Sequence, residues 1–286
     1  MKIAWATDIH LDFITHPSNP IASAKNLDVF SKLLNKNNPE YIILTGDISI
    51  APHLLDHLIA LESRTLVPIY FVLGNHDFWR GDIETVRRTM TRLSSGSERI
   101  RYLSAIPYVM LSNDIALIGH DGWYDGLNGN PHDTPFNMND WYQIADYVSV
   151  NKMGSKGPNS PNIDAILGVA RRQAKKATQH IADGIKSMLA QQKPKKIIIA
   201  THVPPFTNPI DLSKNSPPDL YPWYSSKTMG DMLLSAAKAY SNISFEVFCG
   251  HIHTKYEGQI TPNLILRSGA AEYAAPNTQG VFDISI

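Results

Sequence analysis

The sequence lacks several features that would place it in a specialised class of protein. It has one cysteine, Cys249, among 286 residues, which excludes an internal disulfide and favours a reducing compartment. No apolar run approaches the length of a membrane span, and the N-terminus lacks the apolar stretch of a signal peptide. The 26 Lys and Arg residues are balanced by 26 Asp and Glu residues, so the chain has no net charge to hold a polyanion. These absences predict a cytoplasmic protein with no membrane partner and disfavour nucleic acid as a ligand.

The composition is otherwise that of an ordinary globular protein. Apolar side chains make up 43% of the chain, and its 17 glycines and 19 prolines are close to average usage. These values exclude disordered, collagen-like and low-complexity chains. The length is sufficient for one sizeable hydrophobic core. Since no internal repeat, linker or shift in composition marks a boundary, we expect residues 1–286 to form a single domain.

Short apolar runs alternate with amphipathic segments along the chain. Several runs are apolar throughout, which is typical of strands covered on both faces. The runs occupy residues 2–7, 41–45, 67–73, 115–119, 196–201, 245–249 and 264–268. Helical spacing follows in segments near residues 27–34, 52–59, 83–93, 163–192 and 227–240. This alternation predicts an α/β sheet protein.

Two features of the pattern are irregular. Gly168 and Gly184 lie inside the longest helical segment and are candidates for breaks that would divide it in two. Residues 120–162 and 203–225 are rich in turn-forming residues and resist a regular assignment. Long loops inside a compact domain are often functional, so we expect both loops to lie near the site.

Potential metal ligands follow five of the apolar runs, at the point where each run ends. They are Asp8, His10, Asp47, Asn75, His202, His251 and His253. In an open α/β sheet the carboxyl ends of parallel strands gather at one edge and form the usual ligand crevice. The side chains are therefore expected to meet there, and their number suits two ions.

The ligand types narrow the choice of metal and suggest a use for it. Imidazole and carboxylate without thiolate select Mn, Fe, Zn, Co or Ni over Cu(I) or an iron–sulfur cluster, with Mn or Fe favoured here. A carboxylate such as that of Asp47 can bridge two divalent or mixed-valence ions about 3.5–4 Å apart, the spacing used by two-metal hydrolases. Spacings such as Asp8-x-His10 and His251-x-His253 place two side chains within reach of one ion.

The motifs together resemble one protein family. Their order is Asp8-x-His10, Gly46-Asp47, Gly74-Asn75-His76-Asp77, His202 and Gly250-His251-x-His253, and it resembles the calcineurin-like metallophosphoesterase family. The resemblance spans residues 8–253 and implies a four-layer α/β/β/α sandwich with two mixed β-sheets. It implies that Asp8, His10 and His253 hold the first ion, that Asn75, His202 and His251 hold the second, and that Asp47 bridges them. It also implies that His76 is a catalytic residue facing the leaving group, oriented by Asp77.

Phosphoester hydrolysis follows from this arrangement. Two divalent ions lower the pKa of a shared water toward ~7, so hydroxide is available to attack phosphorus in line. Protonated His76 would assist the departing alkoxide, and Asp77 would hold the ring and raise its basicity. The alternative from another functional class is a catalytically silent scaffold that uses the same fold to bind protein partners.

The residues after Asp47 bear on the substrate. A protein phosphatase of this family is expected to have an arginine shortly after the Gly-Asp pair, whereas residues 48–52 are Ile-Ser-Ile-Ala-Pro. Without that guanidinium, a small-molecule phosphodiester, including a nucleotide-like one, is favoured over a phosphomonoester. A monoester remains open because Arg80, Lys152, Lys156 or Lys214 could reach in from loops. The oligomeric state is left open.

Other residues near the motifs have two interpretations. His120 and Asp121 either line the same crevice or form a surface turn. The loop aromatics either wall the site or, as we favour, pack as a satellite core; they are Trp123, Tyr124, Phe136, Trp141, Tyr142, Phe206, Tyr221, Trp223 and Tyr224. Trp79 is expected to pack rather than to contact substrate. His16, His53, His57, His132 and His180 are expected to be ordinary surface residues.

Overall fold

Two mixed β-sheets form the centre of the molecule. The computed structural model describes residues 1–16, 18–134, 137–151, 161–211 and 220–284. The first sheet has the strand order β11 (Gly280–Asp283), β1 (Lys2–Ala6), β2 (Tyr41–Thr45), β3 (Ile69–Val72) and β4 (Ile100–Tyr102). The second has the order β5 (Val109–Met110), β6 (Ile115–Gly119), β7 (Lys196–Ala200), β8 (Ser244–Cys249), β10 (Leu264–Ser268) and β9 (Tyr256–Thr261). Central strands pair in parallel, whereas β11, β5 and β9 are antiparallel to their neighbours.

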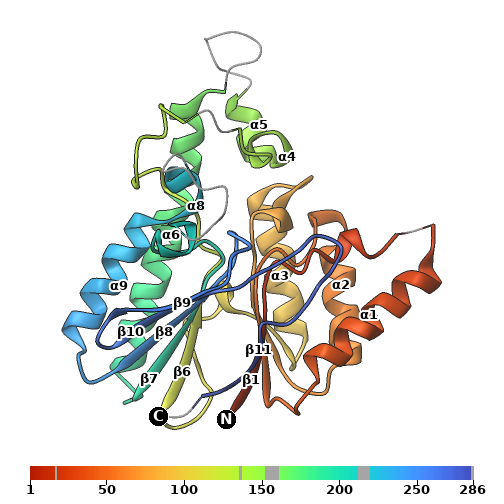
Figure 1. Ribbon diagram of the computed structural model, residues 1–286, viewed down its shortest axis with the longest axis horizontal. Helices are drawn as coiled ribbons and strands as arrows, with labels where there is room; N and C mark the ends of the chain where they lie inside the picture. The colour runs from red at the N-terminus through yellow and green to blue at the C-terminus, as the bar shows by residue number, and fades with distance from the viewer. Residues whose placement is uncertain (17, 135–136, 152–160, 212–219, 285–286) are drawn as a thin grey trace.

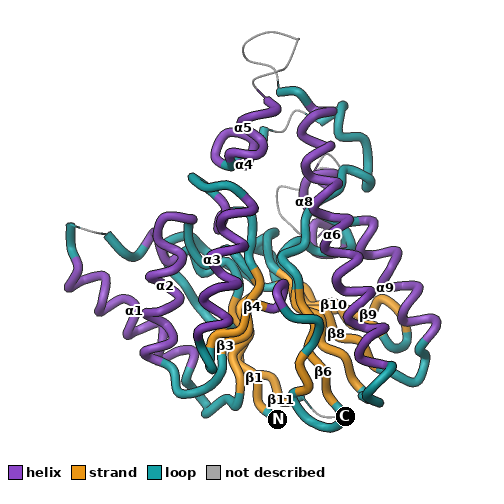
Figure 2. The backbone as a smooth tube through the Cα atoms, turned by 180° about the vertical axis from the view of Figure 1, so that it is seen from behind, coloured by secondary structure: helices purple, strands orange, loops and turns teal. Residues whose placement is uncertain are grey.

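Helices cover the outer face of each sheet (Figures 1 and 2). The first sheet carries α1 (Pro20–Leu34), α2 (Ala51–Arg64) and α3 (Ile83–Gly96), and the second carries α6 (Ile163–Leu189) and α9 (Lys227–Ala239). Short 3-10 helices lie at η1 (Leu11–Phe13), η2 (His76–Phe78) and η3 (Leu103–Ala105). The expected four-layer α/β/β/α sandwich with two mixed sheets is confirmed.

Alternation along the strands explains why the runs are apolar throughout. In β2, Ile42 faces the helices while Ile43 packs between the sheets. In β7, Ile197 and Ile199 face α6 and α9 while Ile198 packs between the sheets. Because successive side chains of a strand point to opposite faces, a strand in the middle of four layers buries both faces.

All seven apolar runs form strands, but the helical expectations need one correction. Helix α6 is continuous over 27 residues, so Gly168 and Gly184 do not divide it. A Cβ at Gly184 would overlap the carbonyl oxygen of Pro107 and approach Ile118. This glycine therefore lets the helix pack closely on the second sheet rather than interrupting it.

The two segments that resisted assignment contain short helices. Residues 120–162 include α4 (Asp140–Gln143) and α5 (Ala145–Asn151), and residues 203–225 include α7 (Asn208–Asp211) and α8 (Tyr221–Tyr224). In Figure 1, α4 and α5 stand above the sheets beside the first turns of α6. Trp123, Tyr124, Trp141 and Trp223 are buried in contact with one another, so these four pack as expected, but they join the core beside the first sheet rather than a separate satellite core. Tyr142 is exposed, which contradicts the expectation for that residue, and Phe136 lies outside the described residues.

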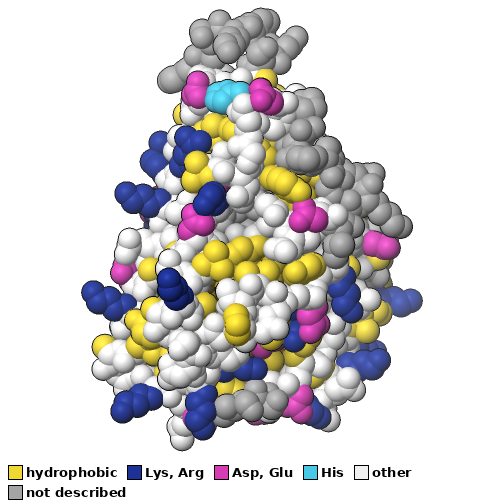
Figure 3. All heavy atoms as spheres, turned by 60° about the vertical axis from the view of Figure 1, so that its left-hand side comes forward, with side chains coloured by type: hydrophobic (Ala, Val, Ile, Leu, Met, Phe, Trp, Pro, Cys, Tyr) yellow, Lys and Arg dark blue, Asp and Glu magenta, His cyan; other side chains and the backbone are white. Residues whose placement is uncertain are grey.

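The surface shows no block of one charge on the face drawn in Figure 3, where basic and acidic side chains are interspersed. Among the described residues, no helix is both long and apolar enough to cross a membrane.

The core between the sheets makes a testable contribution to stability. Replacing Ile198 by Ala should lower the free energy of unfolding by about 2–5 kcal/mol, because its side chain is fully buried between the sheets. Urea denaturation measures this change, with Leu66→Ala as the control because Leu66 is 89% exposed. A loss in the Ile198 variant no larger than in the control would contradict the assigned packing.

Candidate metal centre

The ends of five strands converge at one edge of the sandwich. Asp8 and His10 follow β1, Asp47 follows β2, Asn75 follows β3, His202 follows β7, and His251 and His253 follow β8. Hydrogen bonds join the sheets at this edge: for example, His202 Nδ1 donates to the Thr45 carbonyl (2.9 Å), and the His251 backbone N–H donates to Asp8 Oδ1 (2.9 Å). Residues from both sheets therefore form a single cluster.

The backbone of this cluster is in an unusual conformation. Five of the seven predicted ligands have positive φ angles, namely Asp8, His10, Asp47, His251 and His253. Left-handed backbone costs a non-glycine residue on the order of 1 kcal/mol or more and concentrates at functional sites. This conformation bends the backbone sharply after the strands that carry these residues, so that side chains two residues apart face the same centre.

Glycines next to the ligands permit close approach. A Cβ at Gly74 would overlap the Asp47 carboxylate, and a Cβ at Gly250 would overlap the Asp8 carboxylate and the Thr7 hydroxyl. The glycines of these motifs are thus required by contacts between neighbouring strand ends.

Asp8, His10, Asp47 and His253 form the first group of potential ligands. Each offers one ligand atom within 4.8 Å of the others. His253 Nε2 lies 3.3 Å from Asp8 Oδ1 and 3.3 Å from His10 Nε2, and His10 Nε2 lies 3.9 Å from Asp47 Oδ2. Two carboxylates and two imidazoles converging in a mostly buried position suit a divalent cation with borderline preferences.

Asn75, His202 and His251 lie on the other side of Asp47. His202 Nε2 is 3.4 Å from Asp47 Oδ1 and 3.1 Å from Asn75 Oδ1, and the rings of His202 and His251 have centroids 5.1 Å apart. Asp47 therefore presents one oxygen to each group, the arrangement expected of a carboxylate shared by two ions.

Backbone carbonyls set the orientation of two imidazoles. His202 Nδ1 donates to Thr45, which leaves Nε2 directed at the cluster. His251 Nε2 lies 3.4 Å from the Trp223 carbonyl, and a hydrogen on that nitrogen leaves Nδ1 as the nitrogen with a lone pair. Metal-binding histidines commonly use the second nitrogen in this way.

Burial and mutual charge shift the pKa values of the cluster. Burial alone would raise the pKa of Asp8, but the hydrogen bond from His253 and the charge of His202 lower it to about 2. Burial would also raise the pKa of Asp47, but His202 and His76 hold this pKa well below its ordinary value. Burial opposes protonation of His202, but the carboxylate of Asp47 raises its pKa to about 10. At neutral pH without metal, the cluster thus holds a proton where a cation would bind.

The structure corrects the expected relation between His76 and Asp77. Asp77 accepts hydrogen bonds from the backbone N–H groups of Ile48, Ser49 and Gly74 (2.9, 2.8 and 2.8 Å), whereas His76 Nδ1 is buried without a partner among the described residues. Asp77 therefore clamps the loops after β2 and β3 together and does not orient the His76 ring. Burial lowers the pKa of His76 to about 4 despite the charge of Asp47, so the ring is neutral rather than protonated at pH 7.

Trp79, rather than Asp77, contacts the His76 ring. The two rings stack with centroids 3.5 Å apart and planes at 23°. Trp79 Nε1 donates to Asp140 Oδ1 (2.8 Å), and the same oxygen accepts from Asn75 Nδ2 (2.8 Å). Burial raises the pKa of Asp140 to about 6, so its carboxylate form prevails at pH 7.

A cavity of about 130 Å³ opens over the cluster. Its described lining comprises Asp47, Asn75, His76, Trp79, Asn137, Met138, Asn139, Asp140, Tyr224, His251, His253 and Tyr273. No lysine or arginine belongs to this described lining. Asn137 to Asp140 come from residues 120–162 and Tyr224 comes from residues 203–225, so both segments reach the site.

The sequence predictions assigned no functional role to Tyr273, Trp79 or Asp140, all of which line the cavity. Tyr273 lies over the cluster, with its ring centroid 4.7 Å from that of His10 and 5.1 Å from that of His253. Trp79 was expected only to pack, but it also lines the cavity, and Asp140 carried no motif. Of the three, only Trp79 carried a signal in the sequence, its position two residues after the Gly74 to Asp77 motif.

Comparisons with known proteins agree with this geometry. A family model described as calcineurin-like phosphoesterase matches residues 1–255. The chain belongs to this family. The family indicates a metal-dependent hydrolase of phosphoesters.

Solved structures show the same fold at low sequence identity. Phosphopantetheinyl hydrolase from Mycobacterium tuberculosis matches with a TM-score of 0.57 and 13% identity, over 94% of this chain and 89% of its own. A dimetal phosphatase from Danio rerio matches with a TM-score of 0.52 and 11% identity, over 94% and 87%. A search of curated proteins found no significant match.

His120 and Asp121 belong neither to the crevice of this phosphoesterase nor to a surface turn. Both are buried, and Asp121 pairs with Arg87 Nε (2.8 Å) while accepting hydrogen bonds from Tyr102 and from the Leu73 backbone. This buried network connects β3 and β4 with α3, so its role is structural.

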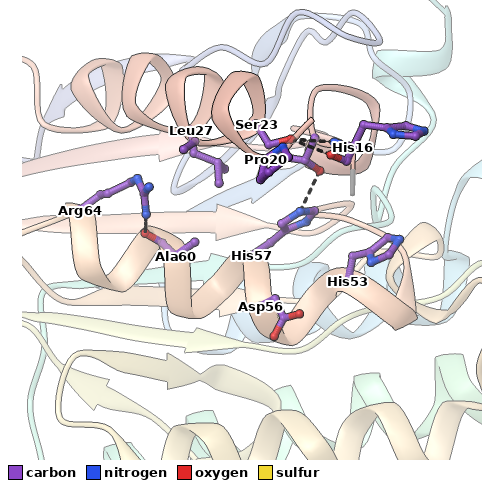
Figure 4. A pocket seen from close by; sticks show the side chains of 11 residues that line it. His16, Pro20, Ser23, Leu27, His53, Asp56, His57, Ala60 and Arg64 are labelled. Carbon is purple, nitrogen blue, oxygen red and sulfur yellow. Dashed lines mark hydrogen bonds between the residues drawn. The ribbon is translucent and has the colours of Figure 1, made fainter. Parts of the chain in front are cut away.

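A second cavity, of about 430 Å³, lies between α1 and α2 (Figure 4). Three histidines line it, and one of them, His57, is buried, which corrects its assignment to the surface. Its nitrogens contact Ser49 Oγ (2.8 Å) and Thr15 Oγ1 (2.9 Å), so the ring is occupied in packing the loop after β2 against α2. Within the described part of the chain, ligand atoms of three or more His, Cys, Asp or Glu residues converge at the Asp8 cluster and not at this cavity.

The raised pKa of His202 predicts a pH dependence of metal binding. Below about pH 10 the ring carries a proton that a cation must displace, so the affinity for Mn²⁺ should rise with pH between 6 and 9 and binding should release protons. Calorimetric titration of metal-free protein in buffers of different ionisation enthalpy measures the release. Binding enthalpies that do not depend on the buffer would contradict this expectation.

Proposed function

We propose that this phosphoesterase hydrolyses small-molecule phosphodiesters, including nucleotide-like ones, with two divalent ions. The observation that carries the proposal is the convergence of seven ligand side chains beneath a cavity without a described lysine or arginine. The family supports phosphoester hydrolysis, and the lining of the cavity supports the choice of ester.

The proposed ligands divide around Asp47. Asp8, His10 and His253 would hold one ion with Asp47 Oδ2, and Asn75, His202 and His251 would hold the other with Asp47 Oδ1. When bound, the two ions would activate water for attack on phosphorus and neutralise charge on the phosphoryl oxygens. Manganese or iron best suits this mixture of carboxylate, amide and imidazole donors.

His76 is proposed to act on the leaving group. Its Nε2 lies 3.9 Å from Asp47 Oδ2, so the ring edge faces the cluster, while its face is held against Trp79. As a neutral imidazole it would donate a hydrogen bond from Nε2 to the departing oxygen, where negative charge develops. Asp77 would act indirectly, because its hydrogen bonds hold together the loops that carry Asp47 and His76.

The charge of the cavity favours a diester over a monoester. A monoester carries two negative charges and is usually gripped by a guanidinium, but the sequence after Asp47 supplies none. Arg80 is exposed and does not belong to the described lining, and Lys152, Lys156 and Lys214 lie outside the described residues. A diester with one negative charge requires less compensation beyond the ions themselves.

The aromatic lining supports substrates with a flat group. Trp79, Tyr224 and Tyr273 surround the cavity, and Tyr273 also contacts the exposed ring of Phe13 (5.0 Å between centroids). Aromatic faces stack on nucleobases and similar rings regardless of their hydrogen-bonding pattern.

The proposal predicts both metal dependence and ester preference. With Mn²⁺ added to metal-stripped protein, kcat/KM for bis-p-nitrophenyl phosphate should exceed that for p-nitrophenyl phosphate, because no fixed cation holds the dianion. His76→Ala should lower kcat by roughly 10²- to 10⁴-fold while metal content is unchanged. A preference for the monoester would refute the diester proposal. A folded, metal-loaded protein inactive on both would favour the scaffold function.

Asp47 allows a test of the shared ligand. Asp47→Ala should remove both ions together, because each ion loses one carboxylate oxygen. Elemental analysis after dialysis against Mn²⁺ measures the stoichiometry, and Asp12→Ala is the control because Asp12 lies beside His10 but outside the proposed ligand set. Retention of one ion by the Asp47 variant would show that Asp47 does not bridge.

A further inference from the structure

We propose that Asp140 is a positioning residue that sets both the amide ligand of the second ion and the ring of His76. The proposal rests on the proposed two-metal function and adds to it a residue outside the family motifs. A single oxygen of Asp140 accepts the two hydrogen bonds, from Asn75 and from Trp79, on which the argument depends.

The first hydrogen bond determines which end of the Asn75 amide faces the centre. An amide side chain can present either its oxygen or its NH₂ group, and only the oxygen is a metal ligand. A carboxylate can only accept, so the Asn75 NH₂ group turns to Asp140 and Oδ1 turns toward His202. Among the described residues, Asp140 is the acceptor that the structure gives the Asn75 NH₂ group, while His202 lies at the oxygen end of the amide.

The second hydrogen bond determines the plane of the Trp79 indole. Its Nε1–H is held by Asp140, and the face of the same indole stacks on His76. Because His76 Nδ1 has no partner among the described residues, ring contacts orient the imidazole: the stacking on Trp79 at 3.5 Å and an edge contact with His10 at 4.6 Å between centroids. Asp140 therefore influences the orientation of His76 indirectly, by fixing the Trp79 indole that stacks on it.

Asp140 is itself held rigidly. It is 1% exposed, and its neighbour Trp141 is buried in the aromatic cluster. Backbone hydrogen bonds tie this segment to the loop after η2, from Arg80 N to Gln143 O (2.7 Å) and from Ala145 N to Gly81 O (2.9 Å). The carboxylate is therefore fixed relative to the loop that it positions.

Metal binding tests whether Asp140 orients the Asn75 amide, and this test does not require turnover. Asp140→Ala should weaken binding of the second Mn²⁺ by roughly 10- to 100-fold and leave the first unchanged, as measured by equilibrium dialysis. Asp140→Asn keeps an acceptor oxygen in place and should restore the affinity to within a few fold. Asp140→Glu keeps the charge but moves the carboxylate by one methylene, so it should bind the second ion as poorly as Asp140→Ala.

The dependence of the hydrolysis rate on the leaving group tests whether Trp79 orients the ring of His76. Trp79→Ala should leave metal binding unchanged but make the rate fall more steeply across aryl phosphodiesters as the pKa of the leaving phenol rises, as His76→Ala should. Trp79→Phe keeps a ring against His76 and should recover most of the difference.

Asp146→Ala is the matched control for both the metal-binding test and the leaving-group test. Asp146 lies in the same segment and accepts a hydrogen bond from Ile83 N (2.9 Å), whereas the described side-chain N–H groups of Asn75 and Trp79 donate to Asp140 instead. It should change neither the second-ion affinity nor the leaving-group dependence, and thermal unfolding verifies that each variant folds.

Several outcomes would overturn the inference. If Asp140→Ala binds both ions with wild-type affinity, Asp140 does not orient the Asn75 amide. If Trp79→Ala has the wild-type dependence on the leaving group, Trp79 does not orient His76. Normal second-ion binding in Asp140→Glu with weak binding in Asp140→Asn would show that charge, not position, matters. If Asp140→Ala does not fold, the Asn and Glu variants still separate these cases. Absence of diester turnover would count against the proposed function, while the dialysis result would still decide the role of Asp140.

Discussion

Two buried carboxylates with little compensating charge are the constraint around which this structure is organised. Asp8 and Asp47 are removed from water at the junction of the two sheets, and burial of an ionised carboxylate is costly unless it is paired. Imidazoles from the opposite sheet supply the pairing, as His253 does for Asp8 and His202 for Asp47. The sheets are thus joined at this edge by polar contacts, whereas elsewhere they are joined by the apolar core around Trp5 and Ile198. A cation placed among these groups would replace shared protons with fixed positive charge.

Much of the fold could be predicted because central strands must be apolar on both faces. That requirement made the seven runs visible, and the polar residues that follow them marked the edge where ligands gather. The edge strands β4, β5, β9 and β11 were missed because an edge strand buries less and carries a weaker pattern than a central one. Gly184 misled the helix prediction because sequence cannot separate a glycine that ends a helix from one that lets it pack closely.

The site was predicted less completely than the fold, for a related reason. Motif residues are local in sequence, but the groups that orient them come from distant segments. Asp140 lies 65 residues from Asn75, and Tyr273 comes from the loop that follows β10. The contact expected between Asp77 and His76 failed because adjacent residues in a 3-10 turn point in different directions, and the backbone N–H groups after β2 were the nearer donors to Asp77.

The left-handed backbone at the ligands has a consequence for how such a site changes over time. Five strained residues together cost several kcal/mol, which is comparable with the net stability of a typical domain of ~5–15 kcal/mol. Glycine or asparagine would relieve that strain at each position and remove or weaken a ligand in the same step. A descendant released from metal binding would therefore gain stability once both members of a buried pair were replaced, because loss of His253 alone would leave the carboxylate of Asp8 without its counter-charge. Loss of the centre would then be favoured by folding itself and hard to reverse, so an intact set of ligands is maintained against a persistent thermodynamic bias.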